Sequence, residues 1–119
     1  MAGVVASEAA GDLAELFHKT PSNMVKSGIL VGLGSTPENA PQVYAERSFN
    51  NNIGRLKPGL RVALISAKQD SIIPQSFQKD TLSKLEAAKV PCTLLETPDK
   101  HGVPAAQYYL DGLNFVLQP

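Results

Sequence analysis

The sequence predicts a three-layer α/β domain, in which a short parallel sheet of about three strands is flanked by helices. Three observations favour this fold class. The 119 residues suit one domain, and 43% of them are hydrophobic. Short apolar runs bounded by turns alternate with amphipathic segments. Strands separated by helical segments imply crossover connections and therefore a parallel sheet. We interpret residues 1–119 as a single domain.

The first half of the chain predicts two helices with a strand between them. Residues 7–19 place apolar side chains at helical spacing and end before Pro21, because the residue before a proline avoids the α region. Residues 25–33 form an apolar run that leads into a Gly-Ser-Thr-Pro loop, which favours a strand. A short helix is predicted over residues 39–48.

The second half alternates more clearly. Residues 60–67 are a short apolar run between turns, as expected of a strand buried on both faces. An amphipathic helix is predicted over residues 75–89, a strand over residues 92–97 and a last helix over residues 104–117.

Two loops of this arrangement carry ionisable side chains. Asp70 follows the strand at residues 60–67, and His101 follows the strand at residues 92–97. In a parallel sheet, ligands and chemistry collect at the carboxyl ends of the strands. We therefore expect Asp70 and His101 to lie together at the carboxyl ends of the strands. Taken singly, Asp70 could instead cap the helix that begins near residue 75, and His101 could be a solvated loop residue.

The two loops also carry a family resemblance. Residues 67–74, AKQDSIIP, fit the pattern G-x-x-D-x-hydrophobic-hydrophobic-P except that alanine replaces the glycine, and residues 98–102, PDKHG, contain His-Gly. Over roughly residues 22–119 the chain resembles the C-terminal half of the α/β-hydrolase superfamily, in its esterase and dienelactone-hydrolase-like branches. The resemblance implies that Asp70 orients His101 and that His101 is the general base of a Ser-His-Asp triad.

The nucleophile of such a triad lacks a matching motif. The family pattern G-x-S-x-G does not occur, and its nearest counterpart is at residues 5–14, VASEAAGDLA. In one register Ser7 is the nucleophile; in the other, residues 7–11 match the motif and Ala9 replaces the serine, which implies an inactive site. Ser7 could also be only a helix cap.

Composition argues against several other classes of function. Eleven basic and eleven acidic residues balance without a basic stripe, so nucleic acid is not an expected partner. No apolar run is long enough for a membrane span, and the N-terminus lacks the basic and apolar regions of a signal peptide. One cysteine and two histidines predict no internal disulfide, no metal site and no cofactor, and suggest a cytoplasmic protein.

These patterns leave two main functional hypotheses. The first is a hydrolase, or part of one, acting on a small ester or acyl substrate through Asp70, His101 and Ser7. The second is a non-catalytic binding or assembly module derived from a hydrolase. The family resemblance implies a complete sheet of about eight strands, so a three-stranded fragment would expose an edge. We therefore expect that a second copy of the chain, in a homodimer, or a complementing chain pairs with the exposed outer strand and continues the sheet.

Overall fold

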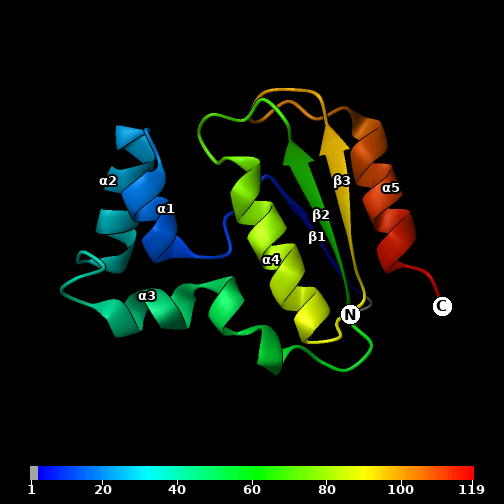
Figure 1. Cartoon of the computed structure of the whole chain (residues 1–119), viewed down its shortest axis with the longest axis horizontal. Coiled ribbons are helices and arrows are strands. Elements are labelled where there is room, and N and C mark those ends of the chain that lie inside the picture. The colour runs from blue at the N-terminus through cyan, green and yellow to red at the C-terminus, as the bar shows by residue number, and fades with distance from the viewer. Residues whose placement is uncertain (1–2) are drawn as a thin grey trace.

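A computed structural model describes residues 3–119 as a three-layer α/β fold around one parallel sheet (Figure 1). The strands are β1 (Gly3–Ser7), β2 (Arg61–Ala67) and β3 (Cys92–Thr97). They lie in the order β1-β2-β3, and both neighbouring pairs are parallel. The expected α/β fold class with a three-stranded parallel sheet is therefore confirmed.

Strand β2 is the centre of the core. Its residues from Val62 to Ala67 are all buried, because strands pair with it on both edges and helices cover both faces. The buried cluster on one side of the sheet joins Val62 and Leu64 to Leu85 of the following helix, with Ile53 and Leu60 from the preceding segment. This rigid centre fixes the positions of the loops at both ends of the sheet.

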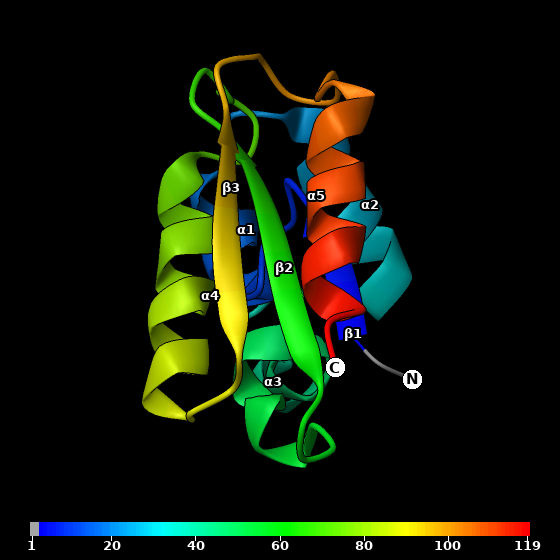
Figure 2. The ribbon, with the colours of Figure 1, turned by 90° about the vertical axis from the view of Figure 1, so that its right-hand side faces the viewer.

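One long helix covers each face of the sheet (Figure 2). Helix α4 (Gln75–Ala87) packs against β2 and β3, and helix α5 (Ala106–Val116) packs on the opposite face against all three strands. Gly112 brings α5 close to the sheet, because a Cβ atom at this position would lie 3.0 Å from Cγ1 of Val5. The predictions of β2, α4, β3 and α5 are confirmed to within about two residues at each end.

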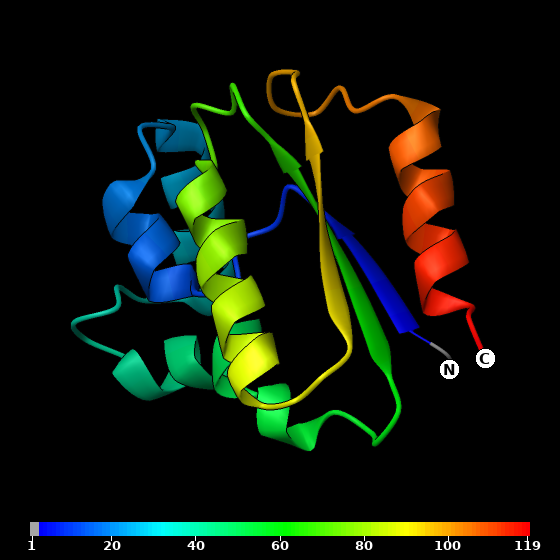
Figure 3. The ribbon, with the colours of Figure 1, turned by 45° about the vertical axis from the view of Figure 1, so that its right-hand side comes forward.

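The connection from β1 to β2 contains three further helices. These are α1 (Leu13–Lys19), α2 (Asn23–Leu33) and α3 (Pro41–Arg47), followed by two short 3-10 turns, η1 (Phe49–Asn51) and η2 (Ile53–Arg55). Figures 1 and 3 show α1, α2 and α3 grouped beyond α4, away from α5. The expected short helix at residues 39–48 is confirmed as α3.

The predicted strand at residues 25–33 is wrong, since these residues belong to helix α2. Ser22 caps this helix by accepting a hydrogen bond from the amide of Val25, and Gly34 ends it in the left-handed conformation with φ 76°. None of the helix's residues is buried, so its apolar run does not reflect a position in the sheet. Capping at both ends decides the structure of this segment.

The predicted helix at residues 7–19 is right only in its second half. The first strand of the sheet is β1, at Gly3–Ser7, and α1 begins later, after Asp12. The carboxylate of Asp12 accepts a hydrogen bond from the amide of Glu15 and so caps α1. The sheet therefore has its expected number of strands, but the first comes from a different part of the chain. Within residues 3–119, no helix is long and apolar enough to span a membrane.

Candidate active site

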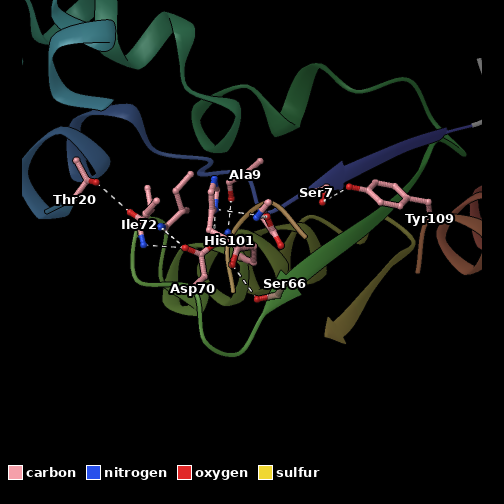
Figure 4. Close-up of polar contacts among 12 residues, drawn as sticks. Ser7, Ala9, Thr20, Ser66, Asp70, Ile72, His101 and Tyr109 are labelled. Carbon is pink, nitrogen blue, oxygen red and sulfur yellow. Dashed lines mark hydrogen bonds and ion pairs between the residues drawn. The ribbon is translucent and has the colours of Figure 1, made fainter. Parts of the chain in front are cut away.

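The structure brings Asp70 and His101 into direct contact (Figure 4). Oδ2 of Asp70 lies 2.6 Å from Nδ1 of His101. The Asp70 side chain is almost fully buried at 1% exposure, whereas the imidazole is 33% exposed. The pair thus has a buried acid and a histidine that remains accessible from one side.

The sheet explains why residues so distant in the sequence meet. Ala67 of β2 pairs with Thr97 of β3, so both strands end at the same level. Beyond the strands, the amide of Lys68 donates to the carbonyl of Thr97, and the amide of Gln69 donates to the carbonyl of Asp99. The two loops are therefore held side by side by their own backbones.

The second oxygen of Asp70 fixes the orientation of its carboxylate. Oδ1 accepts hydrogen bonds from the amides of Ile72, at 2.9 Å, and Ile73, at 2.8 Å. Bonds from backbone amides to a carboxylate are charge-assisted and comparatively strong. Thr20 anchors the same loop from α1, since its hydroxyl donates to the carbonyl of Ile72. Oδ2 is left aimed at His101.

Glu8 is a third member of the site that sequence reasoning missed. It follows β1 directly, as Asp70 follows β2, and its side chain is buried at 4% exposure. Oε2 accepts a hydrogen bond from the amide of Gly102 and lies 3.6 Å from Nδ1 of His101. Oε1 is buried and has no hydrogen-bond partner among residues 3–119. A sequence prediction of β1 would have identified Glu8 as a candidate, because Glu8 would then stand at the carboxyl end of a strand.

The backbone turns sharply at Glu8. This residue has φ 51°, in the left-handed region that non-glycine residues rarely adopt. Its amide still donates to the carbonyl of Ile65 in β2, so the turn begins at the last step of the ladder. The residue at the turn is therefore Glu8, which stands between Ser7 and Ala9, the residues that the two registers place at the serine position.

Gln78 holds the segment that follows this turn. Its side-chain oxygen accepts from the Ser66 hydroxyl at 2.9 Å, and its side-chain nitrogen donates to the carbonyl of Ala9 at 2.7 Å. Gln78 and Ser66 are both fully buried. Helix α4 thereby connects the central strand to the backbone beside Glu8.

Ser7 is not brought to the histidine by a hydrogen bond. Its hydroxyl accepts from the hydroxyl of Tyr109 at 3.1 Å, and Figure 4 shows this contact apart from the Asp70–His101 pair. In the part of the chain that the structure describes, the hydrogen bond of the His101 ring is the one with Asp70. The site therefore joins a buried carboxylate to an imidazole, with Glu8 beside them and Ser7 facing α5.

Solved structures with the same fold include peptidases and an esterase. A puromycin-hydrolyzing peptidase of Mycobacterium tuberculosis matches 92% of this chain with a TM-score of 0.73 and 22% identity. A truncated carbohydrate esterase from gut microbiota matches 98% with a TM-score of 0.73 and 18% identity. The fold is that of the α/β-hydrolases. Dipeptidyl peptidase 4 of Porphyromonas gingivalis matches 93% with a TM-score of 0.67 and 14% identity.

This chain is short compared with these proteins. The chain spans 16% of the length of the Mycobacterium tuberculosis peptidase and 41% of the truncated esterase. No protein-family model and no curated protein sequence matches it. The structural matches therefore establish the fold alone.

Proposed function

We propose that this chain supplies the acid and the histidine of an α/β-hydrolase that cleaves carboxylic esters or related acyl compounds. The observation that carries the proposal is the 2.6 Å contact between Asp70 and His101. The structurally similar proteins include a peptidase that hydrolyses puromycin and a carbohydrate esterase, which supports hydrolysis as the class of reaction.

The geometry suits each residue to its proposed role. The Nδ1–H group of His101 donates a hydrogen bond to Asp70. This bond holds the imidazole in one tautomer and leaves Nε2 as the acceptor. Nε2 then takes the proton of an attacking hydroxyl and later returns it to the leaving group. Asp70 stabilises the imidazolium that forms between these steps, and its amide partners keep it in place.

In this proposal the nucleophilic serine comes from another molecule, because within residues 3–119 the His101 ring is hydrogen-bonded to Asp70 and Ser7 to Tyr109. Strand β1 forms one edge of the sheet, and its pairing in residues 3–119 is with β2 alone. We propose that the open side of β1 accepts a further strand, from a second copy or from a complementing chain, which brings a serine to Nε2 of His101. An unpaired strand edge is a ready template for such pairing.

An activated ester tests the Asp70–His101 pair without a guess about the substrate. We expect slow hydrolysis of p-nitrophenyl acetate by the pure chain, lost in His101→Asn and weakened in Asp70→Asn. His18→Ala is the matched control, because His18 is the other histidine, is exposed, and pairs with Glu38 and not with Asp70 or Glu8. Equal rates in the wild type and His101→Asn would contradict the proposed role of the histidine.

A fluorophosphonate probe, read out by mass spectrometry, then asks which hydroxyl reacts. Labelling of Ser7 that disappears in His101→Asn would make Ser7 the nucleophile despite its contact with Tyr109. Labelling of a serine in a complementing chain, only when the two chains are mixed, supports the proposal as stated.

Light scattering tests the proposed association. We expect a concentration-dependent rise of the mean mass above that of one chain of 12.7 kDa. A constant monomer mass over the whole accessible concentration range would contradict pairing between copies and leave the complementing chain as the source of the extra strand.

The second candidate function is a binding module without catalysis. An apolar pocket of about 180 Å³ lies against the sheet, lined by side chains of β1 and β2 together with residues 9–11. Because this pocket borders the segment after Glu8, it could hold a small apolar group beside the site. Failure of both the ester assay and the labelling experiment would favour this function.

A further inference from the structure

We propose that Glu8, Asp70 and His101 form a binding site for a transition-metal dication such as Zn²⁺. Each residue offers one ligand atom, and the three atoms lie within 4.8 Å of one another. The three residues come from the ends of three neighbouring strands, so the sheet holds them in place. The set combines two carboxylates with an imidazole, and an imidazole nitrogen favours zinc and similar metals over magnesium or calcium.

The charge balance of the site favours a cation. Glu8 and Asp70 are both buried, with side-chain exposures of 4% and 1%, and His101 is the basic side chain beside them. Two ionised carboxylates in a buried site are costly unless they are paired with positive charge. A dication would neutralise both of them, with His101 binding it as the neutral imidazole.

A buried carboxylate oxygen without a hydrogen-bond partner is a second observation. Every other carboxylate oxygen of this cluster has a partner: Oδ1 of Asp70 has two amides, Oδ2 has the imidazole, and Oε2 of Glu8 has the amide of Gly102. Oε1 of Glu8 is buried and has none among residues 3–119. Buried polar atoms without a partner are rare, and a bound ion is one of their ordinary explanations.

The distances require only a small adjustment. Zinc holds carboxylate oxygen and imidazole nitrogen at about 2.0–2.2 Å, so its ligand atoms lie roughly 3–4 Å apart. The separation of 3.6 Å between Nδ1 of His101 and Oε2 of Glu8 is already in this range. The 2.6 Å hydrogen bond between Nδ1 and Oδ2 of Asp70 would lengthen as the metal replaces the proton between these atoms.

Metal binding and the proposed catalytic pair therefore exclude each other. The Asp70–His101 hydrogen bond uses Nδ1, and the metal would use the same atom. If the proposed hydrolase function is right, Zn²⁺ inhibits it by removing the proton that orients His101. The metal site itself does not depend on that function, because its ligands all lie in this chain.

Calorimetric titration of the pure chain with Zn²⁺, in a buffer that does not coordinate metal, tests the site. We expect binding of one ion per chain in the micromolar range, and much weaker binding of Mg²⁺. Glu8→Gln should weaken Zn²⁺ binding by about tenfold or more, since losing even an outer partner of a metal ligand typically costs 10–100-fold. This variant keeps an oxygen that can accept from Gly102.

Two further variants make the titration decisive. His101→Asn should also lose the binding, and His18→Ala should keep it, because His18 pairs with Glu38 and is not part of the proposed ligand set. Circular dichroism without metal establishes that each variant is folded. No binding of Zn²⁺ to the wild type, or equal binding by the wild type and Glu8→Gln, would overturn the proposal. Neither result depends on ester hydrolysis or on probe labelling.

Discussion

His101 and Asp70 are 31 positions apart in the sequence, yet their side chains lie 2.6 Å from one another at the edge of the sheet. The contact depends on two parallel strands that end in register and on backbone hydrogen bonds between the loops that follow them. Asp70 contributes to the stability of this edge as well as to any chemistry, because its carboxylate joins the imidazole to two backbone amides.

Asp70→Asn should therefore destabilise the fold. The substitution removes the charge from a buried group that accepts three hydrogen bonds. We expect the free energy of unfolding to fall by about 1–3 kcal/mol. Urea denaturation at neutral pH measures it. Asp111→Asn is the control, since Asp111 is exposed and, among residues 3–119, is hydrogen-bonded only to Gln107 on its own helix. It should change stability by less than about 0.5 kcal/mol. Equal losses in both variants would contradict a special role for Asp70.

Much of the fold follows from local pattern. Residues 61–67, 75–87, 92–97 and 106–116 adopt the predicted structures, because a buried strand and an amphipathic helix have different periods and lengths. Two errors show where pattern fails: α2 is predicted as a strand, and β1 is not predicted as one. Both are short apolar runs, and what separates them is capping by Ser22 and Gly34 in one case and pairing with β2 in the other. Pairing is a property of the folded chain and is not visible in a local window.

The candidate site was predictable to the same extent. Asp70 and His101 each follow a predicted strand, so the sheet rule places them together. Glu8 falls within the segment predicted as helical, and its role depends on a left-handed turn and on a contact with Gly102, 94 positions away. The prediction of no metal site rests on the counts of histidine and cysteine, which do not include carboxylates. The carboxylates become candidate ligands only once the fold gathers them.

Glu8→Gln should stabilise the chain in the presence of a metal chelator. Glu8 places a buried carboxylate near that of Asp70 and leaves one oxygen without a hydrogen-bond partner among the described residues. The neutral amide removes this charge and keeps an acceptor for Gly102. We expect an increase of about 1 kcal/mol in the free energy of unfolding, measured in urea with EDTA.

The matched control for Glu8 is Glu46→Gln. Glu46 lies on the exposed surface of α3 and pairs with Gln42, so its substitution should change stability by less than about 0.5 kcal/mol. Added Zn²⁺ should raise the stability of the wild type and leave that of Glu8→Gln nearly unchanged, since a ligand stabilises only the form that binds it. A clear destabilisation by Glu8→Gln in EDTA would mean that the carboxylate is satisfied without metal.

Gln78→Leu should weaken the connection between the central strand and the turn at Glu8. Leucine has a similar size but leaves the Ser66 hydroxyl and the Ala9 carbonyl without their present partner. We expect a loss of about 1–3 kcal/mol in the free energy of unfolding. Gln107→Leu, on the exposed face of α5, provides the comparison and should be nearly neutral. Hydrogen exchange of amides in residues 8–11 should also accelerate in Gln78→Leu, and unchanged exchange there would contradict the link.

The packing of α5 against the sheet gives a last prediction, based on two helical glycines in opposite environments. A side chain at Gly112 would meet Val5 of β1 and Ala63 of β2, with the nearest atom 3.0 Å from the new Cβ, whereas a Cβ atom at Gly32 in α2 would meet no atom within 4 Å. Gly112→Val should destabilise the fold by about 1–3 kcal/mol, because the helix must move away from a close-packed sheet. Gly32→Ala should stabilise it by about 0.5–1 kcal/mol, because alanine loses less backbone entropy in a helix. Thermal unfolding of both variants measures the difference. If both changed stability in the same direction, helix propensity alone would explain them, and the close approach of α5 to β1 would have no energetic consequence.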